Sequence, residues 1–221
     1  VCVIMRYTLR LLTLDQLARA AGLVCALEIE RVAAGGRLGS WRFEIGLWVG
    51  MAATPNVLGR KGDGTHASAR TITRQFKSDP KNKPSPIPLE DCPWCGKKFG
   101  ASSFSLDPND DYPVNLRIVC INPACEFHGD IGLPIVAVDE PLYRRLPAFL
   151  IATVDKFASL PFVGPSGALL GGADRSDDKG FYGAAEPGHG KRLSAALLPP
   201  DLVIQDELHL ISGPLGTMTG L

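Results

Sequence analysis

The segment "DLVIQDELHLI" (residues 201–211) decides how the rest of the chain is interpreted. It opens with an apolar run typical of a buried strand and then places Asp206 and Glu207 side by side. In open α/β sheets, ligands bind beyond the carboxyl ends of the strands. At such an end Asp206 can hold Mg²⁺ beside a nucleotide's phosphates, and Glu207 can orient and deprotonate an attacking water. An acidic helix N-terminus is the alternative interpretation, because acids stabilise the first turn of a helix.

Upstream of this motif, segments with strand and helix character alternate. Thr13 is the expected N-cap of a long amphipathic helix. Its apolar residues recur at helical spacing and are Leu14, Leu17, Ala18, Ala21, Val24 and Cys25. The region 163–191 holds eight glycines without a convincing period and is expected to be a long surface loop. The alternation predicts an α/β domain with a largely parallel sheet. The expected strands are 1–6, 43–50, 133–139, 148–154 and 201–205, and the expected helices are 13–32, 154–160 and one beginning near Leu208.

Composition excludes few partners. Lysine plus arginine and aspartate plus glutamate both number 23, so any nucleic-acid surface must be a local patch. No run approaches the 18 or so apolar residues that a membrane span needs, and no signal-peptide pattern is present, so we expect a cytoplasmic protein without a membrane partner. Because the chain opens at Val1 inside a strand-like run and stops within helix-like sequence, we expect it to be part of a longer protein.

Four of the six cysteines are clustered in the sequence. "CPWCG" and "CINPACEFH" form a Cys-x2-Cys pair and a Cys-x4-Cys pair separated by 24 residues. Two such knuckles supply four thiolates to one tetrahedral ion, which suits Zn²⁺, and Gly96 permits the tight turn of the first knuckle. Buried or disulfide-bonded thiols are the alternative. The predicted metal ligands are Cys92, Cys95, Cys120 and Cys125.

Several other features of the sequence bear on this site. His128 is a spare candidate ligand, but four sulfurs already complete a closed structural site, which disfavours a zinc-dependent hydrolase. Cys2 and Cys25 lie in apolar contexts typical of buried free thiols. The stretch 60–83 is rich in lysine and arginine, and it is either a solvated helix with a linker or a phosphate-contacting face.

A nucleotidase of this kind needs a phosphate-binding loop of the form G-x-x-x-x-G-K-[ST] between a strand and a helix. The segment "AEPGHGKR" (residues 185–192) imitates it. Ala185 replaces the first glycine, Arg192 replaces the metal-binding hydroxyl, and no strand is expected before it. We therefore do not interpret it as a phosphate-binding loop.

Three segments together resemble one enzyme superfamily. "VIQDELHLI" resembles motif II of the superfamily 2 DExH-type helicases and translocases, and "FLIATVDKFASLP" (149–161) and "VIMRYTLRLLTLDQLARAA" (3–21) are similar to segments with which these enzymes grip a nucleic-acid backbone. With its inserted cysteine ribbon, the set is most similar to the large helicase-like proteins of bacterial phage-defence systems of the DISARM type. The resemblance implies a partial RecA-like P-loop NTPase domain formed by 1–80 and 133–221, with a zinc ribbon inserted at 81–132.

The resemblance also implies functions for individual residues. Asp206 would coordinate Mg²⁺, Glu207 would activate water, and His209 would couple the nucleotide site to the nucleic-acid groove. Backbone phosphates of DNA or RNA would be contacted by Arg6, Thr8 and Thr153; capping of the next helix is the alternative for Thr153.

The implied activity is ATP hydrolysis coupled to DNA or RNA in antiviral defence, with ATP, Mg²⁺, structural zinc and other defence-system subunits as partners. The P-loop and the second RecA-like domain have no match in these 221 residues, so this segment alone is not expected to hydrolyse ATP. The alternative function is a non-catalytic zinc-ribbon module that binds nucleic acid.

Overall fold

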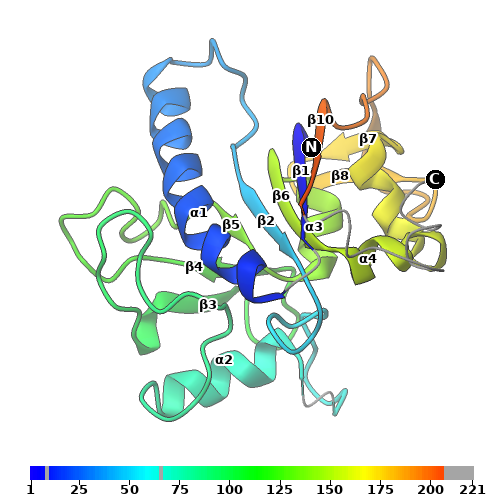
Figure 1. Cartoon of the computed structure of the whole chain (residues 1–221). Coiled ribbons are helices and arrows are strands. Elements are labelled where there is room, and N and C mark those ends of the chain that lie inside the picture. The colour runs from blue at the N-terminus through cyan, green and yellow to red at the C-terminus, as the bar shows by residue number, and fades with distance from the viewer. Residues whose placement is uncertain (8–9, 65–66, 207–221) are drawn as a thin grey trace.

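The computed structural model describes residues 1–7, 10–64 and 67–206 (Figure 1). The elements follow one another along the chain in a mixed order of helices, strands and short 3-10 turns. In chain order they are β1 (Val3–Tyr7), α1 (Arg10–Ala33), β2 (Ile45–Trp48), α2 (Ala69–Ser78), η1 (Ala101–Ser103), β3 (Phe104–Asp107), β4 (Asn115–Ile118), β5 (Ile135–Val136), α3 (Asp139–Arg145), β6 (Phe149–Thr153), α4 (Val154–Ala158), η2 (Leu160–Phe162), η3 (Gly164–Leu170), β7 (Ala173–Asp177), β8 (Gly180–Gly183), β9 (Lys191–Arg192) and β10 (Leu202–Gln205).

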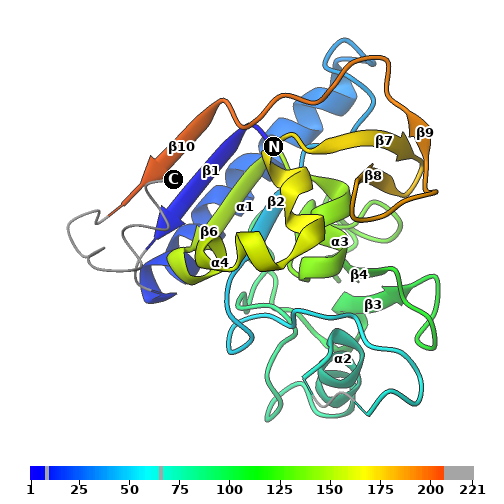
Figure 2. The same ribbon diagram turned by 90° about the vertical axis from the view of Figure 1, so that its right-hand side faces the viewer.

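The centre of the fold is a parallel sheet. In the described ranges five strands pair in the order β10-β1-β6-β2-β5, and every pairing is parallel (Figures 1 and 2). Ile4 of β1 lies opposite Val203 of β10 on one side and Leu150 of β6 on the other. The predicted α/β fold with a mainly parallel sheet is confirmed, and the arrangement is consistent with a partial RecA-like domain.

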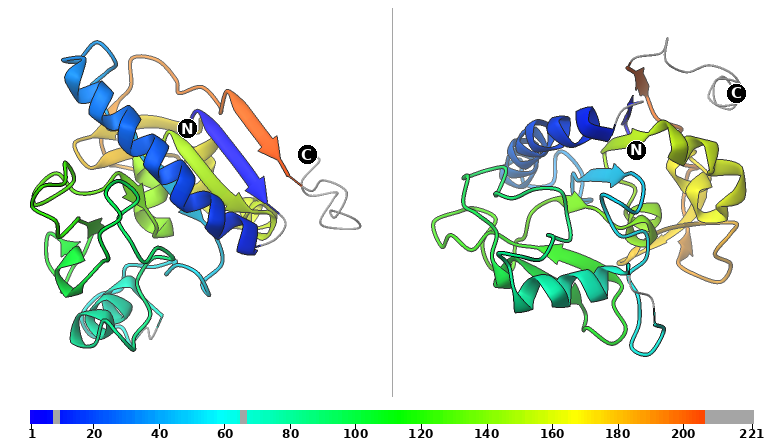
Figure 3. Two further views of the ribbon diagram at one scale, coloured as in Figure 1. Left: turned by 60° about the vertical axis from the view of Figure 1, so that its left-hand side comes forward. Right: turned by 60° about the horizontal axis from the view of Figure 1, so that its bottom comes forward.

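The inner strands of this sheet are buried on both faces. Ile45 and Leu47 of β2 pack into the core beneath α1, whereas Trp48 packs into a second core beneath α3. In β6, Ile151 and Leu150 divide between the two cores in the same way. Successive residues of a strand point to opposite faces, so helices on both sides are needed to cover such a sheet. Figure 3 shows α1 crossing one face, with α3 and the β7–β8 hairpin on the other.

Helix α1 begins at Arg10, which corrects the expected start. Thr13 therefore lies within the helix and not at its N-cap. Leu17 and Ala21 of the predicted apolar face are buried, but Ala18 is exposed. The polar Glu28 occupies the same buried face, where it accepts two hydrogen bonds from the Arg31 guanidinium. A charged residue at a core position is tolerated there because its partners are in place.

The cysteine-bearing segment packs against the same core as α1. Strands β3 and β4 form an antiparallel pair beside α2 (Figure 3). Cys92 and Cys25 belong to one continuous cluster of buried residues. The backbone of Pro93 approaches α1 at Gly22, where an added Cβ would lie 3.2 Å from the Pro93 carbonyl oxygen. The boundaries expected at 1–80, 81–132 and 133–221 therefore divide only the sequence, because one buried core contains residues from all three segments.

Two expectations about the C-terminal part are wrong. The region 163–191 is folded: it contains η3, β7 and β8, and β7 pairs antiparallel with both β8 and β9. Its hairpin turn is held by the Asp177 carboxylate, which accepts hydrogen bonds from the backbone amides of Lys179 and Gly180. The small sheet is half exposed, so its strands carry polar residues and give little apolar periodicity.

Strand β10 was expected to be buried, but it lies at an edge of the described sheet (Figure 2). Its apolar side chains are 36–50% exposed because β10 pairs only with β1 among the described strands. The residues concerned are Leu202, Val203 and Ile204. None of the helices in the described ranges combines the length and the apolar character required to cross a membrane.

Gly46 in β2 offers a test of this packing. A Cβ at position 46 would lie 2.5 Å from Cγ of Pro147 and 3.0 Å from Cδ1 of Leu150. Gly46→Ala is therefore expected to lower the free energy of unfolding by about 1–3 kcal/mol, the usual cost of overpacking a core. Gly50→Ala is the matched control, because a Cβ there meets nothing within 4 Å. Equal urea midpoints for the two variants would contradict the predicted close packing.

Candidate functional site

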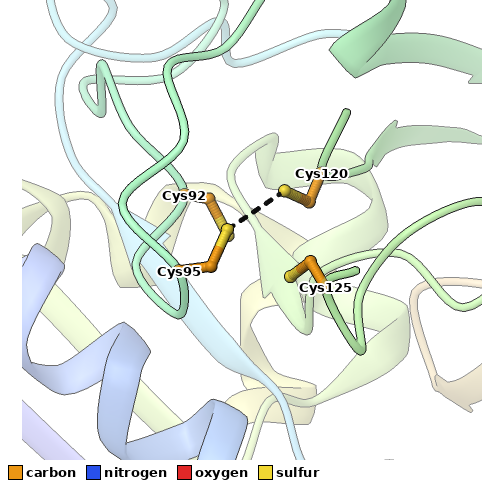
Figure 4. Close-up of side chains that lie close together, drawn as sticks. All are labelled: Cys92, Cys95, Cys120 and Cys125. Carbon is orange, nitrogen blue, oxygen red and sulfur yellow. Dashed lines mark hydrogen bonds between the residues drawn. The ribbon is translucent and has the colours of Figure 1, made fainter. Parts of the chain in front are cut away.

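The four clustered cysteines come together in space. Cys92, Cys95, Cys120 and Cys125 each offer a sulfur, and these atoms all lie within 4.8 Å of one another. Figure 4 shows the two pairs facing each other across one small volume, each pair on its own loop. Four thiolates bound to one zinc at about 2.3 Å stand about 3.8 Å apart, so this arrangement fits a tetrahedral ion. The cluster can hold a metal ion such as zinc.

The backbone turns around these cysteines are tight knuckles. In the first, the amide of Gly96 donates to the carbonyl of Cys92 at 2.9 Å, with φ at Gly96 of +72°. In the second, the Cys125 amide donates to the Asn122 carbonyl, and the Asn122 amide points at the Cys120 sulfur at 3.4 Å. Amide groups aimed at sulfur stabilise the thiolate form. The knuckles thus present their sulfurs ready for a cation.

The protonation of the thiols depends on local burial. Burial raises the pKa of Cys92 to about 11 and also raises that of Cys125. At Cys95, burial acts in the same direction but is outweighed by hydrogen bonds from the Lys97 backbone and from the Cys120 and Asn122 side chains, so its pKa is lowered to about 7. Buried thiols that resist ionisation on their own need a nearby positive charge, and a bound dication supplies it.

His128 is not one of the clustered ligands. Its Nδ1 lies 2.9 Å from the carbonyl oxygen of Cys120, and a carbonyl can only accept, so Nδ1 carries the proton. The ring therefore supports the second knuckle from outside. This agrees with the expectation that four sulfurs complete the site.

A second group of predicted site residues lies along one edge of the parallel sheet. Asp206 directly follows β10, Arg6 is near the end of β1, and Thr153 ends β6. The Asp206 amide donates to the Arg6 carbonyl at 3.0 Å, and Tyr7 of β1 lies opposite Thr153 of β6. Burial, and next the negative charge of Asp206, raise the pKa of Tyr7. Residues from three separate parts of the sequence thus meet at the carboxyl edge.

Arg6 and Thr153 have polar groups that the described structure does not satisfy. The Arg6 guanidinium carbon lies 4.7 Å from the centroid of the Phe157 ring, and burial lowers the Arg6 pKa. Within residues 1–7, 10–64 and 67–206, neither Nε of Arg6 nor Oγ1 of Thr153 has a hydrogen-bond partner. Thr153 occupies the N-cap position of α4, but its side chain makes no capping bond. The capping alternative for Thr153 is therefore not met.

The remaining predicted residues of this site lie outside the described residues. They are Thr8, Glu207 and His209, together with the helix expected from Leu208.

A buried polar network behind this edge escaped the sequence interpretation. The Lys156 ammonium donates to Asp139 at 2.5 Å and to Oδ1 of Asn56 at 3.2 Å. Tyr143 donates to the same Asp139 carboxylate and accepts from Nε1 of Trp48. Burial raises the Asp139 pKa, and the charge of Lys156 opposes that rise. The only signal in the sequence was a lysine just after a strand, at a position that more often faces water.

The first turn of α3, which begins at Asp139, also binds the loop that follows β2. Glu140 accepts a hydrogen bond from the Leu58 amide at 2.6 Å, next to the ion pair made by Asp139. The first turn of α3 therefore holds both α4, through Lys156, and the segment around Asn56 and Leu58. These are the segments that follow two neighbouring strands at the carboxyl edge, so the network sets their relative positions.

Breaking the buried ion pair tests this positioning. Lys156→Met leaves the Asp139 carboxylate uncompensated and is expected to cost about 3–5 kcal/mol of folding free energy. The double variant Asp139→Leu with Lys156→Met removes both charges and should lose much less. A double-mutant cycle in urea measures the difference. Additive effects would mean that the two side chains do not depend on each other.

The basic stretch 60–83 divides into two parts. In the first part, Lys61 and Arg70 both form ion pairs with Asp111 of the ribbon. The helix expected in this stretch is α2, capped by the Ser68 side chain, and its residues Arg74 and Lys77 are exposed. The imitation of a phosphate-binding loop at 185–192 leads into β9 and not into a helix.

No protein-family model matches the chain. A search of curated proteins finds similarity over its whole length to the DISARM protein DrmA of Bacillus paralicheniformis (strain ATCC 9945a / NCIMB 11709 / CD-2). The two are 35% identical over 233 residues, and the match includes 100% of this chain. The chain spans only a fifth (20%) of that relative's length, so it is homologous to one part of a DISARM protein DrmA.

Proposed function

We propose that the chain is part of the first motor domain of an ATP-dependent nucleic-acid helicase or translocase. The observation that carries the proposal is the meeting of Asp206, Arg6 and Thr153 at the carboxyl edge of adjacent parallel strands. An acid at this edge suits a nucleotide's metal, and donors beside it suit phosphates. Motif II and the two backbone-gripping segments of the superfamily 2 enzymes resemble the sequences at these same places.

In this proposal each predicted site residue has one task. Asp206 holds Mg²⁺ through its carboxylate, and Glu207 orients and deprotonates the attacking water. His209 links the nucleotide site to the nucleic-acid groove. The side chains of Arg6, Thr8 and Thr153 bind backbone phosphates. The cation, when bound with ATP, neutralises charge that develops on the phosphates.

The described part of the chain fits this proposal in two respects. Asp206 is half-buried, its amide donates to the Arg6 carbonyl, and its negative charge acts on Tyr7, so an acid lies at the carboxyl end of β10, where a nucleotide's cation would bind. The Arg6 guanidinium is already oriented by the Phe157 ring, and its Nε has no acceptor among the described residues. A phosphate oxygen would satisfy that donor.

A part in bacterial phage defence follows from the relative. The similarity to a DISARM protein supports a defence protein of that type, which acts in the cytoplasm with DNA or RNA and other subunits of its system. The four-cysteine ribbon, residues 81–132, binds structural zinc in this proposal, because its closed sulfur set leaves no coordination position for a substrate.

The alternative is a non-catalytic module in which the ribbon and the nearby basic residues bind nucleic acid. One measurement separates the two: ATP turnover by the full-length protein with and without added single-stranded DNA or RNA. A motor is expected to hydrolyse ATP faster when nucleic acid is present. Salt-dependent binding of nucleic acid without any turnover would instead favour the module.

A further inference from the structure

We propose that a groove between the segment 80–85, which contains Pro80 and Pro84, and the first cysteine knuckle binds single-stranded nucleic acid. The groove has a volume of about 640 Å³, within the range of ordinary ligand sites. It lies on the ribbon, apart from the sheet edge where Asp206 and Arg6 meet. The inference rests on the proposed nucleic-acid partner and assigns it a second contact.

The floor of the groove is apolar and aromatic. Phe76, Leu89 and Phe99 line it. Phe76 and Phe99 each pack edge-on against Phe104, with ring centroids 5.3 Å and 5.4 Å apart. Phe104 itself is fully buried, so both rings are held in place from below. Phe76 and Leu89 are themselves buried, so the half-buried Phe99 is the ring on which an exposed base would stack.

The rim of the groove is positively charged. Among the described side chains that line it, the lysines Lys81, Lys83 and Lys98 face a single acid, Glu90. Lys98 and Glu90 form only a long contact of 3.9 Å in solvent, which binds neither strongly. Lysines beside an apolar floor match a chain of phosphates that carries exposed bases.

The turn that carries two of these lysines is built in advance. The Asp79 carboxylate accepts hydrogen bonds from the backbone and side-chain amides of Asn82, and the Lys83 amide donates to the Asp79 carbonyl. The backbone of Lys98 pairs antiparallel with the backbone of Asp91 across the first knuckle. The rim therefore needs little ordering when it binds, which favours affinity.

Single-stranded nucleic acid fits these features better than duplex does. In a duplex the bases are stacked inside and cannot reach an apolar floor, whereas a single strand offers both its bases and its phosphates. A free nucleotide shares this chemistry, but it offers fewer phosphates to a rim that carries several lysines.

The test is anisotropy of a fluorescein-labelled twelve-residue oligo-dT titrated with the full-length protein at several salt concentrations. The variant Lys81→Ala/Lys83→Ala/Lys98→Ala is expected to bind at least about 10-fold more weakly at physiological salt. Its slope of log affinity against log salt should fall by about 2, because each phosphate contact on a single strand contributes about 0.7. Phe99→Leu should weaken binding by about 5-fold without changing that slope, since stacking carries no charge.

The matched control removes the same charge elsewhere. Lys179→Ala/Lys191→Ala/Arg192→Ala replaces exposed residues in or beside the small antiparallel sheet and should leave both affinity and slope unchanged. Melting curves establish that each variant is folded. The proposal is overturned if the full-length protein does not bind the oligonucleotide, or if the two triple variants bind it equally.

Competition experiments with unlabelled nucleic acids distinguish the possible ligands of the groove. Unlabelled oligo-dT and oligo-U should displace the probe, whereas equal displacement by duplex or by dTMP would refute a single-strand site. ATP turnover is measured separately. If the full-length protein shows no ATP turnover but the groove variant loses oligonucleotide binding, the groove proposal is supported and the motor proposal is refuted. ATP turnover together with unchanged binding by the groove variant would support the motor proposal and refute the groove proposal.

Discussion

Replacing Cys92 with serine is expected to abolish stoichiometric zinc binding and to unfold the ribbon. Wild-type protein should contain about one zinc per chain, held by four sulfurs within 4.8 Å of one another. Structural zinc sites contribute an apparent binding free energy of roughly 10–16 kcal/mol, which becomes folding free energy where no site exists in the unfolded chain. A serine hydroxyl does not replace a thiolate ligand, so most of this stabilisation should be lost. Elemental analysis and hydrogen exchange over residues 81–132 measure the two effects.

The matched control is Cys2→Ser. Cys2, which was expected to be buried, is an exposed free thiol outside the cluster, so its replacement should change neither metal content nor exchange. Removal of zinc from wild-type protein by a chelator should reproduce the Cys92→Ser pattern. Protein purified without zinc, or a Cys92→Ser variant that keeps it, would contradict the metal site.

The ribbon connects this prediction to the rest of the fold. Cys92 belongs to the same buried cluster as Cys25 of α1, and the backbones of Lys98 and Asp91 pair across the first knuckle. Loss of zinc should therefore loosen both the cover over one face of the sheet and one wall of the lysine-lined groove. The parallel strands, with a second core on their other face, are expected to remain protected.

The sequence predicted well what depends on neighbouring residues. Cysteine spacing identifies the knuckles because two residues separated by a tight turn approach each other whatever the rest of the chain does. Apolar runs such as 148–154 identify inner strands, because a strand covered on both faces carries few polar residues. The carboxyl edge of the sheet was also predictable, because parallel strands that are each followed by a helix all end at the same edge.

The features that escaped prediction depend on distant partners. β10 was expected to be buried because of its composition, but its exposure is set by how many strands pair with it. Lys156 lies 17 residues from Asp139 and 100 from Asn56, so no local pattern indicates its burial. The region 163–191 failed as a predicted loop because β7, β8 and β9 stabilise one another through backbone pairing, which polar side chains do not reveal.

Glu207→Gln is expected to lower nucleic-acid-stimulated ATP turnover by about 10²–10⁴-fold in the full-length protein, the contribution usual for a general base. Glutamine keeps the size of the side chain but cannot accept the proton of the attacking water. Asp206→Asn should reduce turnover as well, by weakening the hold on Mg²⁺. Binding of single-stranded nucleic acid should stay within about 2-fold of wild type for Glu207→Gln, because the proposal assigns its carboxylate to the attacking water and not to the backbone phosphates. Steady-state ATPase assays and anisotropy measure the two quantities.

The geometry of β10 supplies the control for this prediction and defines the result that would contradict it. Asp201→Asn removes an exposed acid before the amino end of the same strand and should leave turnover unchanged, whereas Asp206 lies at the carboxyl end beside Arg6. If acids at the two ends were equally dispensable, Asp206 and Glu207 would be an ordinary acidic turn. The lysine-lined groove would then carry the nucleic-acid function alone. If only the carboxyl-end acids are required, the parallel sheet acts as a nucleotide site and the ribbon serves as its attached nucleic-acid contact.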